Sequence, residues 1–435
     1  MTPRSLVTTR ITKRASQFPE VDLAPMDTDC LDQRDAALAR AIEQAIARRW
    51  LTLKTVIESQ IDRDFVSMQP QLQASLLVGS AQLLLLEKLP DHAVINEAVE
   101  SSKSKLGKGA AGFTNAVLRK VADLRSEIVE THDPDRCDEL PLNDGRAWRL
   151  NKNIFDKEVD IRLAQQTAHP PALITQWKKH LGTNCYADIA RHSIVHPPIL
   201  ITGLDSEHPN CKPHCQSEFA VFSGNIAELQ KLLGCNPDAR VQDPAAALAV
   251  KATADLQLST IIDACAGKGT KTKQLHQQHP QAQIIASDTY KTRLDSLREL
   301  SNKSPWLRIT ETGKLSEFAG RADLLLLDVP CSNTAVLARR PEAKYRFSRK
   351  SIEQLTSIQR QIAADYLLLL ANAGYLLYST CSLSDKENRT QVDWMMKWHG
   401  FKLINEGFHL PKGQPGDDPA EYTDGGYFAL LQKQA

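Results

Sequence analysis

A chain of 435 residues is too long for one ordinary domain, so we expect two or three. Hydrophobic residues make up 42% of it, which is enough for substantial cores and excludes global disorder. No apolar run reaches the roughly 18–20 residues of a membrane span, and no continuous apolar segment follows the basic N-terminus. We therefore expect a cytoplasmic protein that binds no membrane. The net charge is +1, so any RNA-binding surface must be a local patch.

Residues 1–145 predict an all-α domain. Apolar residues recur with helical spacing in 35–49 and 72–86, and two shorter helices are expected at 92–103 and 113–121. Pro90 and nearby glycines separate these segments, and no strand alternation appears among them.

The remaining chain divides near residue 241. Residues 146–240 are rich in proline and predict a small connecting subdomain of mixed structure. In 241–435, short apolar runs alternate with helical segments, which favours a doubly wound, mostly parallel sheet. The expected strands are 259–264, 283–287, 307–310, 323–329 and 374–380, and the expected helices are 272–278, 292–300 and 352–371.

A glycine-bearing turn follows the first of these strands, at 263–272 (DACAGKGTKT). Such a turn lets backbone approach a ligand and points helix N–H groups at it. By itself it fits a mononucleotide, a dinucleotide or S-adenosylmethionine, although the missing Walker A spacing disfavours an NTPase. Asp288 ends the second strand and is placed to accept hydrogen bonds from a ribose, or to cap the next helix.

Two cysteines stand directly after two further strands. Cys331 follows an Asp-Val-Pro turn and Cys381 follows Tyr-Ser-Thr, so parallel pairing brings both to one edge of the sheet. A lone buried cysteine is usually a small hydrophobe, but two at equivalent strand ends suggest chemistry. C5 of cytosine accepts a methyl group only after a thiolate adds to C6, and a second group must then assist elimination.

These motifs resemble the RNA cytosine-C5 methyltransferases of the Sun/Fmu type, which methylate small-subunit rRNA and carry a NusB-like N-terminal domain. The resemblance rests on the turn at 263–272, on 328–341 (DVPCSNTAVLARRP) and on 378–382 (YSTCS) followed by Glu387-Asn388. The N-terminal half agrees in segments such as 82–92 and 112–119.

The resemblance implies a Rossmann-like domain with S-adenosylmethionine as cofactor, and it assigns roles to residues. Cys381 would attack C6, Cys331 would assist product release, and Asp328 would orient the base. Asp288 would hold the ribose hydroxyls. The cofactor-binding residues that it implies are Cys265, Ala266, Gly267, Lys268, Gly269, Thr270, Lys271, Asp288 and Asp328.

Departures from the family pattern support a second hypothesis. Lys268, Thr270 and Thr312 replace a proline, a glycine and an aspartate, and Asn333 and Ala335 replace two glycines. A catalytically weak RNA-binding or ribosome-assembly factor that keeps the fold would tolerate such changes. A DNA cytosine methyltransferase is disfavoured because those enzymes order their motifs differently.

The expected partner is RNA, most simply a single-stranded loop or bulge of 16S rRNA, since the target base must leave its stack. The basic segment 339–350, which includes Lys344, Tyr345 and Phe347, predicts a surface that contacts phosphates and stacks on bases. A second basic face is expected from Lys103, Lys105, Lys108, Arg119, Lys120 and Arg125. We expect a monomer that binds no DNA.

The nine cysteines are odd in number and scattered, so a disulfide framework is not expected. Cys211 and Cys215, with His208, His214 and Cys235, suggest zinc. Their loose spacing favours scattered structural thiols instead, and we expect no metal.

Overall fold

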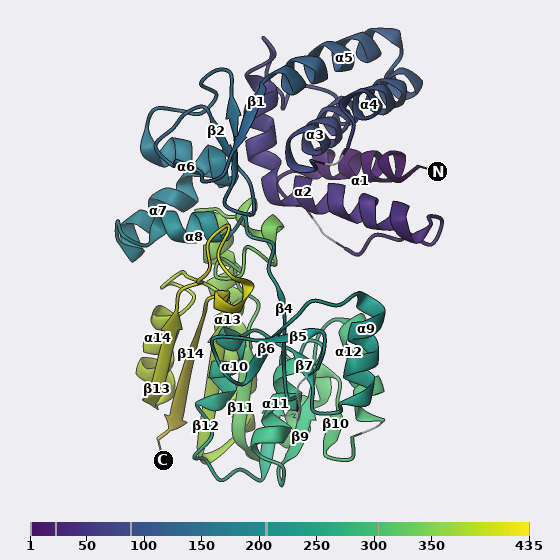
Figure 1. Cartoon of the computed structure of the whole chain (residues 1–435). Coiled ribbons are helices and arrows are strands. Elements are labelled where there is room, and N and C mark those ends of the chain that lie inside the picture. Colours follow the sequence, from purple (N-terminus) through teal and green to yellow (C-terminus); the bar gives the residue numbers. More distant parts are fainter. Residues whose placement is uncertain (1, 22–23, 88, 205–207, 303, 435) are drawn as a thin grey trace. The chain divides into compact units, whose positions relative to one another are not determined.

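The computed structural model describes residues 2–21, 24–87, 89–204, 208–302 and 304–434. The chain forms two compact units, which are described separately (Figure 1). The first comprises 1–196, 337–348 and 414–417, and the second comprises 197–336, 349–413 and 418–435. The predicted connecting region 146–240 is thus divided between the two units. No helix within the described ranges is long and apolar enough to cross a membrane.

The first unit is a helical bundle with a small sheet beside it. Its core is made by apolar side chains of α2 and α3, such as Ile42, Ile46, Leu76 and Leu77, which are completely buried. Three short antiparallel strands pair in the order β1-β3-β2. The elements are α1 Pro3–Gln17, α2 Gln33–Glu58, α3 Pro70–Leu85, α4 Asp91–Leu106, α5 Lys108–Asp123, β1 Arg125–Val129, β2 Glu139–Pro141, β3 Ala147–Leu150, α6 Val159–Thr167, α7 Pro171–Leu181 and α8 Tyr186–His192.

The basic segment 339–350 corrects one prediction. Lys344 is fully buried in the first unit, where its ammonium donates to the carbonyls of Arg48 (2.9 Å) and Thr167 (3.0 Å). The hydroxyl of Tyr345 is also buried, donates to the carbonyl of Ala47 at 2.8 Å and lies 3.1 Å from the amide nitrogen of Trp50. Both side chains form hydrogen bonds with backbone atoms of α2, so they are not available to phosphates or bases. The predicted RNA-binding role is therefore wrong for these two residues.

The second unit contains the predicted doubly wound sheet. Seven strands lie in the order β10-β9-β8-β11-β12-β14-β13, with parallel pairing from β10 to β12 and antiparallel pairing of β14 with both neighbours. The strands are β8 Thr260–Asp263, β9 Gln283–Ala286, β10 Leu307–Ile309, β11 Ala322–Asp328, β12 Leu370–Thr380, β13 Phe401–His409 and β14 Gly426–Lys433. The helices are α10 Pro244–Lys251, α11 Thr270–Gln278, α12 Lys291–Ser301, α13 Arg349–Tyr366 and α14 Arg389–His399.

Side-chain alternation along β11 explains why helices cover both faces of this sheet. Leu324 and Leu326 pack with residues of α10, α11 and α12, whereas Leu325 and Leu327 pack with residues of α13 and α14. All four are completely buried. The carboxyl ends of β8, β9, β11 and β12 therefore stand at one edge of a rigid sheet, which is where the predicted site residues lie.

A smaller sheet also belongs to the second unit. Its strands pair in the order β5-β6-β4-β7. They are β4 Ile199–Thr202, β5 Cys211–Pro213, β6 Phe219–Phe222 and β7 Arg240–Val241, with α9 Ile226–Cys235 between the last two.

Candidate active site

The turn after β8 contains two glycines in left-handed backbone conformations. Gly267 and Gly269 have φ of 58° and 85°, while Thr270 is the first residue of α11. The threonine that replaces a family glycine therefore occupies a helical position, which suits an L-residue. A side chain at Gly269 would approach Leu300 and Leu297 within about 3.1 Å, whereas the space beside Gly267 is open. The turn thus leaves room for a ligand at Gly267.

Asp288 follows β9 and holds this turn. Its Oδ2 accepts from the Gly267 amide at 3.0 Å and from Arg293 at 3.3 Å, and its Oδ1 accepts from the Tyr290 amide at 2.9 Å. A carboxylate offers about four acceptor positions, so one remains for a ribose hydroxyl. Asp288 does not cap α12, because Tyr290 is the N-cap and no side chain caps that helix, so the alternative of a helix cap is wrong. Its ribose contact stays a prediction.

Lys271 and Asp328 form a partly buried ion pair beside the cysteines. Their Nζ and Oδ2 atoms lie 2.7 Å apart, and the other Asp328 oxygen accepts from the Ser379 hydroxyl at 2.8 Å. Burial lowers the pKa of Lys271, but the charge and hydrogen bond of Asp328 outweigh it, with a further contribution from Cys381, so the net pKa is raised. Lys271 is therefore a fixed cation that faces both Asp328 and the Cys381 thiol.

Cys331 and Cys381 meet as the strand order predicted. Their sulfur atoms are 3.1 Å apart, and the Cys381 amide donates to the Cys331 sulfur at 3.3 Å. The thiol of Cys381 also donates to the side-chain oxygen of Asn333 at 3.0 Å. The hydrogen bond with Cys381, followed by burial and the charges of Cys381 and Glu387, raises the pKa of Cys331 well above its ordinary value. Cys331 therefore retains its proton, while Cys381 is the more exposed of the two.

Glu387 fixes both cysteine loops, a role that the sequence motif did not reveal. It is completely buried, and its Oε1 accepts from the Ser332 amide at 2.9 Å and from Gln359 at 3.1 Å. Its Oε2 accepts from the hydroxyls of Ser332 and Ser382, both at 2.5 Å. Because Ser332 follows Cys331 and Ser382 follows Cys381, one carboxylate sets the separation of the two sulfur atoms.

Asp263 at the end of β8 was quoted only as part of a motif, yet it is the most perturbed carboxylate of the region. Burial raises its pKa to about 7, and Thr272 partly opposes this by donating to its Oδ2 at 2.7 Å. Its Oδ1 has no hydrogen-bond partner among the described residues. Burial, followed by the charges of Asp263, Asp328 and Asp288, raises the pKa of the nearby Cys265, so Cys265 is not a third nucleophile.

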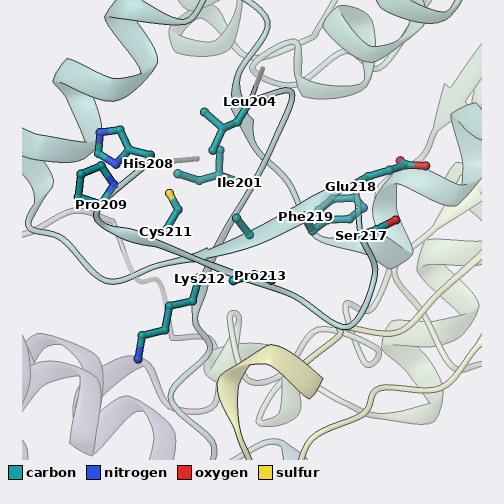
Figure 2. Close-up of a pocket in the computed structure, with 11 residues that line it drawn as sticks. Ile201, Leu204, His208, Pro209, Cys211, Lys212, Pro213, Ser217, Glu218 and Phe219 are labelled. Carbon is teal, nitrogen blue, oxygen red and sulfur yellow. The ribbon is translucent and has the colours of Figure 1, made fainter. Parts of the chain in front are cut away.

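A pocket in the second unit lies apart from these residues. The pocket of about 670 Å³ is formed around β5 and β6, with His208 and Cys211 on one side and Ser217 and Glu218 on the other (Figure 2). None of its lining residues belongs to the predicted site. His214 lies outside the pocket, with its Nε2 2.9 Å from the Tyr422 carbonyl. Over the described residues, no three His, Cys, Asp or Glu side chains gather in a metal-binding arrangement.

Comparisons with known proteins agree with the geometry. Residues 251–423 match the family described as 16S rRNA methyltransferase RsmB/F, and residues 10–123 match the NusB family. The chain thus joins a region similar to the NusB family to a region similar to the RsmB/F methyltransferases. It is an rRNA methyltransferase with S-adenosylmethionine as its cofactor.

Individual relatives cover almost the whole chain. Ribosomal RNA small subunit methyltransferase B of Vibrio cholerae is 28% identical over 417 residues, which are 92% of this chain and 90% of that protein. The same-named protein of an Escherichia coli strain is 25% identical over 423 residues, 95% and 94% of the two chains. The crystal structure of PH0851 covers 100% of this chain and 99% of its own, with a TM-score of 0.72 and 19% identity, and so shares the fold.

The residues at this edge of the large sheet suit the cofactor. The open space at Gly267, the remaining acceptor position of Asp288 and the uncompensated oxygen of Asp263 are features that a ligand with hydroxyl and ammonium groups would satisfy. When bound, S-adenosylmethionine supplies an electrophilic methyl group. The residues that would hold it are those of 265–271 together with Asp288.

Proposed function

We propose that the protein methylates C5 of a cytosine in small-subunit rRNA through a covalent bond between Cys381 and C6 of the base. The observation that carries the proposal is the pair of sulfur atoms 3.1 Å apart at the ends of β11 and β12, with the Lys271 cation beside them. A thiolate is the nucleophile this chemistry needs, and a nearby cation favours it.

The proposed steps use both thiols. The Cys381 thiolate forms a bond to C6, which makes C5 nucleophilic enough to take the methyl group while S-adenosylhomocysteine leaves. Once Cys381 is bound to C6, the hydrogen bond and the negative charge of Cys381 no longer raise the pKa of Cys331, so that pKa is lowered and the Cys331 proton passes to solvent. The Cys331 thiolate then removes the proton from C5, the C6–S bond breaks, and Cys381 departs as a thiolate.

Asp328 is the proposed partner of the base. Lys271 and Ser379 hold its carboxylate in a fixed orientation, and its side chain is partly exposed at the edge where the cysteines lie. A carboxylate in this position accepts a hydrogen bond from the exocyclic amine of cytosine, which distinguishes it from uracil. The proposed substrate is a flipped-out cytosine in a loop or bulge of 16S rRNA.

The surface on α4 and α5 is the proposed contact for the surrounding RNA. Lys103, Lys105, Lys108, Arg119 and Lys120 are exposed there. Lys103 lies 3.3 Å from the exposed Glu100, and the less exposed Arg125 pairs with Asp91. Exposed cations of this kind contact phosphates without reading sequence.

Nucleoside analysis tests the proposal. Wild-type protein, unmethylated small-subunit rRNA and S-adenosylmethionine should give 5-methylcytidine, and Cys381→Ala should give none while still binding cofactor. Methylation of another atom, or turnover by Cys381→Ala, would contradict the assignment. The alternative of a catalytically weak assembly factor, motivated by Lys268, Thr270 and Thr312, predicts RNA binding without measurable cofactor binding in a calorimetric titration.

A further inference from the structure

A small cavity in the first unit is lined by cations and by no carboxylate among the described residues. Its volume is about 110 Å³, and it lies against one face of α2, with walls from the end of α3, the β2–β3 turn and the stretch after α8. Its polar lining comes from Arg48, Arg49, Gln44, Asn143 and His196. All of these residues belong to the first unit, so this cavity is separate from the methyltransferase site.

Arg49 is the least satisfied group in this cavity. The residue is 3% exposed, and its Nη1 donates to the carbonyl of Pro141 at 2.9 Å. Its Nε and Nη2 are buried and have no hydrogen-bond partner among the described residues. Burial lowers the pKa of Arg49 to about 10, which reflects the cost of holding the charge there. A buried guanidinium with unused donors is costly unless an anion or another acceptor reaches it.

Charges near the cavity add to its positive potential. Burial, followed by the charges of Arg48 and Arg49, lowers the pKa of Lys344 well below its ordinary value. The Lys344 ammonium donates to two backbone carbonyls and brings no negative charge to the cavity. The buried carboxylate of Glu139 is taken by Arg149 and by the amide of Asp133. The positive potential at the cavity is therefore not balanced by an acid that lines it.

We propose that this cavity binds a single phosphate group, which comes either from an RNA backbone or from free inorganic phosphate. A water molecule occupies about 30 Å³, so the cavity holds a few waters or one tetrahedral oxyanion. It is smaller than the roughly 300 Å³ at which pockets for organic ligands begin. The guanidinium groups of Arg48 and Arg49 supply the positive charge that a phosphate requires, and the amides of Gln44 and Asn143 supply further donors. The RNA source rests on the proposed function; the phosphate site does not.

Thermal unfolding of the full chain in inorganic phosphate and in chloride, at equal ionic strength and about pH 7.5, tests the site. Phosphate should raise the melting temperature of wild type, because at a tenfold excess over Kd binding raises the folded-to-unfolded ratio about elevenfold. Asn143→Asp places a carboxylate in the cavity and leaves the Arg49–Pro141 bond intact, so it should lose the response. Asn184→Asp, an exposed change in the same unit, should keep it. No phosphate-specific rise in wild type, or an equal rise in Asn143→Asp, would overturn the proposal.

The salt dependence of RNA binding then identifies the source of the phosphate. One lost contact to single-stranded RNA lowers the slope of log K against log salt by about 0.7. That decrease in Asn143→Asp, but not in Asn184→Asp, would assign the cavity to an RNA phosphodiester. Equal slopes with the thermal response intact in wild type would assign it to free phosphate. Failure of methyl transfer leaves both measurements interpretable, so the two proposals fail separately.

Discussion

Replacing Asp263 by asparagine should change the pH dependence of stability in a defined direction. Its pKa is about 7 in the folded protein, against 3.8 for an ordinary aspartate. Between these values the folded state holds a proton that the unfolded state has lost, so stability contributed by this group is complete below about pH 4 and disappears as pH rises through about 7. A shift of about three units corresponds to about 4 kcal/mol. The asparagine side chain cannot ionise, so the free-energy cost of ionising Asp263 in the folded protein is absent from the variant.

The assay is urea unfolding of wild type and Asp263→Asn at about pH 4.5, 6 and 8, followed by a signal from the second unit. The stability of the variant relative to wild type should increase by about 2–4 kcal/mol across this range, because the other titrating groups cancel in the difference. Asp255→Asn removes an exposed carboxylate from the same unit and serves as the control for a changed net charge. A relative stability that is constant with pH, or that falls as pH rises, would refute the reasoning.

Substitutions at three other positions test the remaining contacts. Asp288→Ala should weaken S-adenosylmethionine by about 1–3 kcal/mol in calorimetry, and an unchanged Kd would leave it only as the clamp of Gly267. Lys271→Met removes the cation beside Cys381, so the rate of methyl transfer should fall roughly tenfold for each 1.4 kcal/mol of transition-state stabilisation that is lost. The rate should recover partly at alkaline pH, and a decrease that is the same at every pH would argue against that role. Glu387→Ala should cost at least about 2 kcal/mol of stability and most of the activity, while Glu387→Gln retains more of both; equal losses would exclude hydrogen bonding as the cause.

The sequence was sufficient for the central sheet and for the meeting of the cysteines. Runs such as Leu324–Leu327 are buried on both faces, so they read as strands without long-range information. Parallel pairing then brings the residues after β11 and β12 together, whatever the details of packing. Helix α1 was not predicted because its polar residues outnumber the buried Val7 and Ile11.

Contacts between distant segments were beyond sequence reasoning. The burial of Lys344 and Tyr345 depends on backbone atoms of α2 almost 300 positions earlier, where α2 departs from helical geometry at Arg49. The same composition on a surface would contact RNA, and nothing local distinguishes the two cases. The roles of Glu387 and Asp263 likewise depend on which hydroxyls and amides surround them, which only the folded chain determines.

The covalent step is tested most directly by a denaturing gel of protein mixed with unmethylated small-subunit rRNA and S-adenosylmethionine. If Cys381 attacks C6 and Cys331 assists elimination, Cys331→Ala should accumulate an RNA adduct that resists denaturant and migrates as a slower band. The Cys331→Ala, Cys381→Ala double variant should show no such band. An adduct in Cys381→Ala would reverse the two roles, and the absence of an adduct in either single variant, with rRNA that wild type methylates, would contradict the two-cysteine mechanism.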